Sequence, residues 1–139
     1  MSVRGPAPRP CQSCPYRRDV PAGVWDESEY AKLRRYDADT ADQPTAAFQC
    51  HQYDAGDTES RLCAGWVGCH GGELLALRLA ATTGVLAEVD IEATFDYQST
   101  VPLFESGAAA ADHGVSEAPG PHARALQEKV LRTRSDIVV

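Results

Sequence analysis

The sequence predicts a mainly α-helical domain, or a small α+β domain, with irregular metal-binding loops around a four-cysteine centre. The first observation behind this prediction is a set of cysteines with the spacing of metal ligands: Cys11, Cys14, Cys50 and Cys63. The second is that several segments carry apolar residues at helical spacing. The third is that stretches rich in glycine and proline separate these segments. The chain of 139 residues is long enough for one domain with its own core.

The division of the chain follows its proline and glycine content. Residues 1–10 are rich in proline and arginine, which predicts a flexible arm. Residues 11–115 carry all five cysteines and are predicted to form the metal-binding domain. Residues 116–139 contain a Pro-Gly-Pro linker and then a charged stretch, which predicts a terminal helix over 122–134.

The clearest helix start lies after the first cysteine pair. Asp26 is a favoured N-cap residue, and Glu29 follows three positions later, as in a capping box. Trp25 and Tyr30 are placed to form a hydrophobic staple across this start. These patterns predict a short helix over about 26–36 that packs its aromatic face inward.

Three further segments have periodic patterns. Residues 73–82 carry leucines and alanines around the whole helix circumference, and Gly84 suits the position that ends such a buried helix. Residues 106–112 predict a short alanine-rich helix. Residues 85–97 alternate apolar with mostly polar side chains, which taken alone predicts a strand, although one of unusual length.

Irregular segments separate the cysteines. Residues 37–47 are expected to form an acidic loop and residues 53–61 a solvent loop. Between them, the short stretch 48–52 delivers the third cysteine. Residues 62–72 contain the fourth cysteine and four glycines, so the backbone there is expected to approach another group closely.

The charge distribution limits the class of partner. The net charge is −7, and the segment 36–121 alone holds fourteen acidic side chains against two basic ones. Such an acidic surface argues against a broad phosphate-binding face, so a nucleic-acid partner is not expected. The partner expected for this protein is another protein, which the sequence does not identify.

The sequence also predicts a cytoplasmic protein. No apolar run approaches the ~20 residues that cross a bilayer, so no membrane association is expected. The amino-terminal residues have no apolar stretch of the kind found in secretion signals. In a reducing cytosol, cysteines serve more often as metal ligands or redox thiols than in disulfides.

The cysteine spacing leaves the cofactor open. Structural zinc sites usually use two close cysteine pairs, whereas only one close pair is present here. Thiolates on separate loops also hold iron–sulfur clusters, and a proline after the pair, here Pro15, occurs in cluster-binding sequences. A 4Fe-4S cluster, a Zn²⁺ ion and no metal at all therefore remain alternatives. Arg17 and Arg18 are placed to offset thiolate charge, or are simply solvated.

Three residues near the set are additional candidate ligands: His51, Cys69 and His70. His51 is alternatively a hydrogen-bond donor to a thiolate or a surface residue. Cys69 is more simply a spare thiol, and His70 a loop or capping residue before a helix. No Ser-His-Asp spacing, phosphate loop or carboxylate pair is present, so the sequence assigns no catalytic residue.

Three segments carry a resemblance: Pro10-Cys-Gln-Ser-Cys-Pro-Tyr-Arg17, Phe48-Gln-Cys-His51 and Cys63-Ala-Gly-Trp66. From about residue 9 to residue 115, the chain resembles an uncharacterised family of small cysteine-rich proteins from high-GC Gram-positive bacteria and their phages. The resemblance implies that the four cysteines act as one set, with His51 beside it. It also implies a helix start at Ala87-Glu88, where members have Pro-Glu, and therefore a helix over 86–97.

These observations lead to an expected function in metal binding. The leading hypothesis is an iron–sulfur protein used for redox sensing or electron transfer. The main alternative is a structural zinc module that presents a surface to a protein or nucleic-acid partner. A third alternative is a metalloenzyme, which requires an open metal position.

Overall fold

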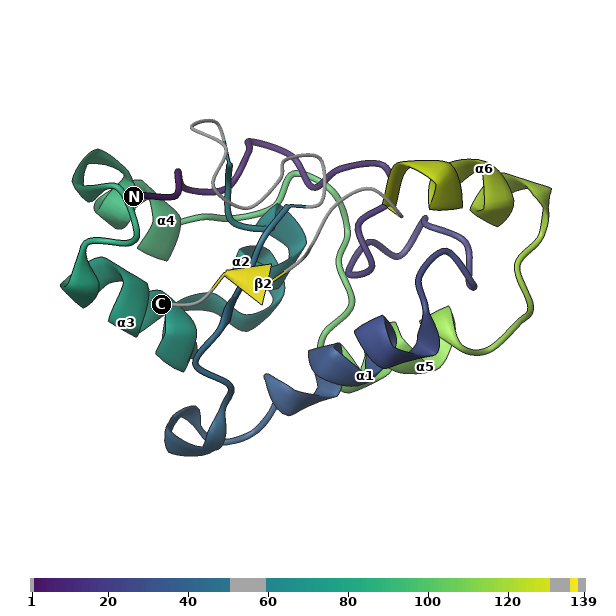
Figure 1. Cartoon of the computed structure of the whole chain (residues 1–139), viewed down its shortest axis with the longest axis horizontal. Helices are drawn as coiled ribbons and strands as arrows, with labels where there is room; N and C mark the ends of the chain where they lie inside the picture. The colour runs from purple at the N-terminus through teal and green to yellow at the C-terminus, as the bar shows by residue number, and fades with distance from the viewer. Residues whose placement is uncertain (1, 51–59, 131–135, 138–139) are drawn as a thin grey trace.

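The computed structural model describes residues 2–50, 60–130 and 136–137. Its helices, drawn in Figure 1, are α1 (Glu27–Arg35), α2 (Ala64–His70), α3 (Leu75–Thr83), α4 (Ile91–Phe95), α5 (Gly107–Gly114) and α6 (Pro121–Val130). Single 3-10 turns are η1 (Thr40–Asp42), η2 (Gly71–Glu73) and η3 (Glu88–Asp90). The short strands β1 (Ala47–Phe48) and β2 (Asp136–Ile137) pair antiparallel. The prediction of a mainly α-helical chain is confirmed.

Helix α1 begins where the sequence predicts. The Asp26 carboxylate accepts a hydrogen bond from Ser28 N at 3.0 Å and so caps the helix. Tyr30 and Leu33 lie on one face of the helix and are buried. The Tyr30 hydroxyl also accepts a hydrogen bond from Trp25 N at 3.2 Å, which holds the preceding chain against the first turn.

Helix α5 lies beside α1, as Figure 1 shows at the lower edge of the molecule. The two helices approach so closely that a Cβ atom on Gly107 would overlap the carbonyl oxygen of Leu33. Near the other end, a Cβ atom on Gly114 would overlap the Tyr30 ring. These two glycines let the alanine-rich helix pack directly on α1, and the helix predicted over 106–112 is confirmed.

Helix α2 is not predicted by the sequence, since it lies within the glycine-rich segment 62–72. It contains Gly65 and Gly68, and each glycine costs about 1 kcal/mol relative to alanine inside a helix. Trp66 and Val67 in the same helix are almost completely buried. Tertiary packing of these side chains therefore stabilises a helix that its propensity disfavours.

Helix α3 confirms the buried helix predicted over 73–82. Its start lies slightly later because η2 occupies the preceding turn. Helix α3 and the residue before it bury small or branched apolar side chains: Leu74, Ala76, Leu77 and Ala80. Gly84 ends the helix with a φ of 84°, the left-handed conformation that glycine adopts without strain.

Within residues 85–97, η3 and α4 together cover 88–95, so the strand that the alternation predicts is wrong. The helical conformation implied by the resemblance is right, over a shorter range than 86–97. Ile91 and Phe95 are four residues apart and pack together against the core. Val89, which a strand would bury on the same face, is 85% exposed. The alternation arose because apolar residues at a spacing of four also satisfy a spacing of two.

The first ten residues, expected to form a flexible arm, pack against the domain from Val3 onward. Val3 is 2% exposed and forms a parallel bridge with Leu86. Arg4 forms a parallel bridge with Arg61, and its guanidinium pairs with Asp90 at 2.6 Å. The buried valine, this ion pair and backbone hydrogen bonds such as that from Arg4 N to Ser60 O at 2.9 Å therefore anchor a segment whose proline content suggested an unstructured chain.

Two extended segments beside this amino-terminal stretch, around Gln49 and Leu62, carry the third and fourth cysteines. Leu62 N donates to Arg4 O at 3.1 Å, and Leu62 also forms an antiparallel bridge with Gln49. The solvent loop predicted over 53–61 lies mostly outside the described residues. Ser60, which is described, is buried, so the end of that segment belongs to the packed interior.

Helix α6 packs on the domain through a buried side chain, Leu126. Gln127 Nε2 donates to Gly23 O at 2.8 Å, which ties the helix to the loop before α1. The helix predicted over 122–134 is seen as far as residue 130, and residues 131–134 lie outside the described chain. Among the described residues, no helix is long and apolar enough to cross a membrane.

We expect the substitution Gly107→Ala to destabilise the fold. The added methyl group overlaps the Leu33 carbonyl, so α1 and α5 must separate, at a cost of about 1–3 kcal/mol in the free energy of unfolding. Urea denaturation measures this change. Gly120→Ala is the matched control, since a Cβ atom there meets nothing within 4 Å. Equal stability of the two variants would contradict the close helix contact.

Candidate metal centre

Cys11 and Cys14 lie on one tight turn. Cys14 N donates to Cys11 O at 3.0 Å, and Arg17 N donates to Cys14 O at 3.1 Å. Prolines on both sides of the pair keep this segment from continuing as a helix. Trp25 Nε1 donates to Ser13 O at 2.9 Å, so the residue before the α1 cap holds the middle of the cysteine turn in place.

Cys50 and Cys63 lie on two antiparallel segments. Cys50 N donates to Arg61 O at 2.9 Å, and Cys63 N donates to Phe48 O at 2.7 Å. Residues two apart on an extended segment point to the same side, so this pairing puts both cysteines on one face of the ladder. Cys63 is also the residue that immediately precedes α2.

A close contact joins the cysteine turn to the start of α2. A Cβ atom on Gly65 would overlap Cys14 Sγ and would lie 2.8 Å from Tyr16 Cβ. Glycine is therefore required at this position for the turn to reach the helix. The close backbone approach predicted for the segment 62–72 is confirmed, and the group approached is the cysteine turn.

The four cysteines are arranged as two sulfur pairs, and all are free thiols. Cys14 Sγ lies 3.9 Å from Cys63 Sγ. The thiol of Cys11 forms a hydrogen bond with Cys50. Each sulfur pair thus joins one cysteine of the turn to one cysteine of the ladder. The two cysteines that are close in sequence belong to different sulfur pairs.

All four cysteines line one cavity of about 390 Å³. Aromatic, amide and basic side chains also line it, among them Trp25, Phe48, Gln49, Arg9 and Arg17. Within residues 2–50, 60–130 and 136–137, no three His, Cys, Asp or Glu side chains already converge on a point where one metal ion would sit. The cysteines therefore meet as two pairs around a shared cavity.

The crowded thiols oppose one another's ionisation. The hydrogen bond with Cys50, together with burial, raises the pKa of the Cys11 thiol far above its usual range. The hydrogen bond with Cys14, together with burial, likewise raises the pKa of the Cys63 thiol. Negative charge on neighbouring cysteines raises both pKa values further. Thiolates in this position are costly unless a cation shares the cavity.

Of the two arginines after the turn, Arg17 is the one that lines the cavity. It pairs with Asp19 at 2.6 Å and donates to Pro10 O at 3.0 Å. The hydrogen bond to Asp19 raises the pKa of Arg17 most, and nearby cysteines raise it further. Arg18 pairs instead with Glu105 at 2.7 Å, so Arg17 is the better placed to offset thiolate charge.

Two of the additional candidate ligands, Cys69 and His70, do not line the four-cysteine cavity. Cys69 and His70 line a separate cavity of about 380 Å³, together with Asp37 and Glu73. Burial raises the pKa of the Cys69 thiol to about 12, so Cys69 is not an activated nucleophile. His51 lies outside the described residues.

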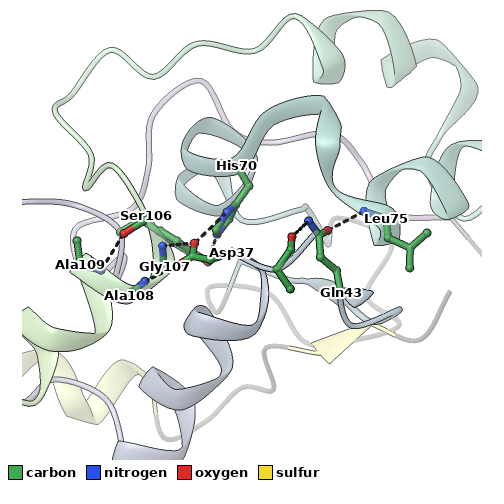
Figure 2. Close-up of polar contacts among 10 residues, drawn as sticks. Asp37, Gln43, His70, Leu75, Ser106, Gly107, Ala108 and Ala109 are labelled. Carbon is green, nitrogen blue, oxygen red and sulfur yellow. Dashed lines mark hydrogen bonds and ion pairs between the residues drawn. The ribbon is translucent and has the colours of Figure 1, made fainter. Parts of the chain in front are cut away.

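Through its two ring nitrogens, His70 connects Tyr16, which follows the cysteine turn, to Asp37, which follows α1. Nε2 lies 2.9 Å from the Tyr16 hydroxyl, and Nδ1 lies 3.8 Å from Asp37 Oδ1, the contact drawn in Figure 2. Burial lowers the pKa of His70 to about 4, against an opposing effect of Asp37. The ring is therefore neutral near pH 7. When Nε2 accepts the Tyr16 proton, the ring carries its own proton on Nδ1, facing Asp37.

Asp37 extends this network to α5. Its carboxylate accepts hydrogen bonds from Gly107 N at 2.7 Å and Ala108 N at 2.8 Å, as Figure 2 shows. These two groups are among the helix N–H donors that have no partner inside the helix. A continuous path of contacts therefore runs from Tyr16, two residues after the second cysteine, through His70 to the start of α5.

The donor set fits a metal centre that prefers sulfur. Thiolates are soft ligands, which select zinc or iron–sulfur clusters over hard cations. Two thiolates at about 2.3 Å from one tetrahedral ion lie about 3.8 Å apart. The 3.9 Å separation of Cys14 Sγ and Cys63 Sγ is close to this value. Metal binding would remove the thiol protons and supply the cation that the crowded sulfurs lack.

Two residues that line the cavity were not singled out in the sequence. Arg9 is exposed at the cavity, and Gln49 is completely buried beside it. Each lies within two residues of a cysteine in the set, and this proximity is the pattern that would have identified them. A polar side chain as deeply buried as Gln49 is unusual on the short apolar segment that carries it.

These features define a small, mainly helical, cysteine-rich protein with four thiols at one cavity. The chain belongs to the family of unknown function DUF6283, which matches residues 6–134. The matched range includes all four cysteines of the cavity, and the expectation of an uncharacterised family is confirmed. No curated protein and no solved structure matches the chain.

The buried neutral His70 predicts a fold that loses stability in acid. Its pKa of about 4 lies below the ordinary value of 6.5, so between these values the unfolded chain binds more protons. The stabilising effect is therefore complete above about pH 6.5 and is lost as the pH falls toward 4, by up to ~3 kcal/mol. Urea denaturation across this range measures the slope.

In the same measurement, His70→Gln should flatten the dependence of stability on pH, because glutamine does not titrate. His122→Gln is the matched control, since His122 is exposed on α6 and its replacement should leave the slope unchanged. Equal slopes in the two variants would mean that burial of His70 does not control the acid sensitivity.

Proposed function

We propose that this protein is an iron–sulfur protein that transfers electrons or senses redox state, with the cluster bound by Cys11, Cys14, Cys50 and Cys63. The observation that carries the proposal is the meeting of four free thiols from three separate segments at one cavity. Thiolates on separate loops are the usual ligands of iron–sulfur clusters. Ten other residues, including two arginines, line the same cavity and would form the surroundings of such a cluster.

The burial of the cysteines supports a redox role. Cys14, Cys63 and Cys50 are 1%, 5% and 8% exposed, whereas Cys11 is partly exposed. A cluster bound here would be shielded from water on most sides and would approach the surface at Cys11. Solvent exposure and nearby charge are two of the factors that set the potential of a cluster.

The charges around the cavity support an anionic centre. Four thiolates with their iron and sulfide carry a net negative charge, which the protein must offset. Arg9 and Arg17 both line the cavity in a chain whose net charge is −7. Basic residues are therefore gathered where the proposed cluster would add negative charge.

A structural zinc module that presents a surface to a partner is the second candidate. The observation that favours it is the 3.9 Å separation of Cys14 Sγ and Cys63 Sγ, which suits two thiolates on one tetrahedral Zn²⁺ ion. In that case the metal would contribute to folding and would have no redox role.

Anaerobic purification distinguishes the two candidates. For an iron–sulfur protein, we expect brown protein with broad absorbance near ~400 nm and with both iron and acid-labile sulfide. Zinc has no visible colour, so a colourless protein with about one zinc ion per chain would favour the second candidate. Metal analysis of the same sample makes the comparison quantitative.

Replacing a cysteine of the cavity should remove the metal and destabilise the fold. Metal binding supplies ~10 kcal/mol or more of folding free energy in small metal-binding domains, against a total stability of ~5–15 kcal/mol. We expect Cys14→Ser to lose most of its bound metal and to melt well below the wild type. Thermal unfolding and metal content are measured together.

Cys69→Ser is the matched control for this experiment, because Cys69 lines the separate cavity beside His70. This variant should keep its full metal content and lose at most ~1–2 kcal/mol of packing. Loss of metal in both variants to the same extent would overturn the assignment of the four ligands.

A further inference from the structure

A cavity of about 550 Å³ lies away from the cysteines, where the start of α1, the end of α5 and helix α6 meet. Residues 23–27 and Tyr30 line it, together with residues around the end of α5 and Gln127 of α6. We call it the α1–α6 cavity, and the elements that border it lie toward the right of Figure 1. Its volume falls in the range of about 300–1,000 Å³ that ligand-binding pockets occupy.

Backbone contacts hold the segments around this cavity in place. Gly23 N donates to Gly114 O at 2.8 Å, and Gln127 Nε2 donates to Gly23 O at 2.8 Å. Gly23 has a φ of 82°, and a Cβ atom there would lie 2.8 Å from the backbone of Pro119. The cavity is therefore shaped by the fold itself, and a partner would find its walls already formed.

The charged side chains that line the α1–α6 cavity are all acidic: Asp26, Glu27 and Glu117. Asp26 and Glu27 lie at the start of α1, where negative charge stabilises the helix, so the fold itself accounts for these two. Glu117 follows α5 and has no such role. Neither Glu27 nor Glu117 pairs with a basic side chain among the described residues. The cavity therefore presents negative charge that the described part of the chain does not offset.

Exposed apolar surface lies at the same cavity. Val115 lines it and is 48% exposed, although most large apolar side chains of the described chain are covered. Trp25 and Tyr30 also line the cavity and are largely buried, so they form its floor and Val115 its accessible part. Covering Val115 would remove apolar surface from water, which favours binding of a partner that carries an apolar group.

We propose that the α1–α6 cavity binds a basic segment of a partner protein, with an arginine side chain at the carboxylates and an apolar residue against Val115. A metal ion needs ligands that converge on one point, and no three His, Cys, Asp or Glu side chains of the described chain do so. Nucleic acid would be repelled by the carboxylates. Arginine fits because its planar guanidinium hydrogen-bonds with carboxylates and is weakly hydrated. The proposal does not depend on which metal the cysteines bind.

The first test titrates the isotope-labelled protein, with its metal as purified, with a synthetic peptide of two arginines and two leucines. We expect saturable binding that weakens as salt is added, with NMR shifts at the residues of the α1–α6 cavity. A matched peptide with citrulline for arginine has nearly the same shape without the charge and should bind at least about fivefold more weakly. Equal affinity of the two peptides, or no saturable binding of the arginine peptide, would overturn the proposal. Calcium ions that shift the same residues at micromolar concentration would also overturn it.

The second test assigns the binding to this cavity. The double variant Glu27→Gln/Glu117→Gln should bind the arginine peptide about 5–20-fold more weakly, as expected for the loss of two partly exposed ion pairs. The double variant Glu88→Gln/Glu92→Gln is the matched control, because it removes the same charge beside another exposed valine, Val89, and does not line the cavity. This control should bind as the wild type does. Equal weakening in the two variants would mean that the peptide is attracted to the acidic surface as a whole, which would overturn the proposal.

Discussion

The contact between the Cys14 sulfur and the backbone of Gly65 is the constraint on which the rest of the structure depends. Any larger residue at position 65 would push the cysteine turn away from α2. Because the turn is seated there, Cys14 meets Cys63 at 3.9 Å, and the other cysteine of the turn meets Cys50. Helix α2, which has a poor helix propensity, is stabilised at the same time because its own side chain Trp66 is buried.

The same turn is held from its other side by a polar network. Tyr16 follows the second cysteine by two residues, is completely buried, and bonds to His70. His70 faces Asp37, whose carboxylate caps α5. The cavity and the α1–α5 pair are therefore connected through consecutive contacts. A change that displaces the turn is expected to affect helix packing, and a change in His70 to affect the position of the turn.

Local patterns predicted the elements whose causes are local. Asp26 caps α1, and Gly84 ends α3, because each effect involves neighbouring residues alone. The predictions failed where distant packing outweighs local preference. The glycines in residues 64–70 did not suggest a helix, yet this segment forms α2. The alternation around Val89 predicted a strand where the chain forms α4. The prolines of the first ten residues predicted a flexible arm, yet the buried Val3 anchors this segment. In each case the deciding contact is made with a residue far away in the chain.

The sequence by itself determined which residues form the candidate site, because two cysteines two residues apart and two more downstream are a pattern that few other arrangements explain. The tertiary structure alone decided how they combine. Cys11 and Cys14 are neighbours in the sequence, yet their sulfurs meet Cys50 and Cys63 instead. That pairing depends on the register of two antiparallel segments and on one glycine contact, and such distances between remote segments are not encoded in spacing along the chain.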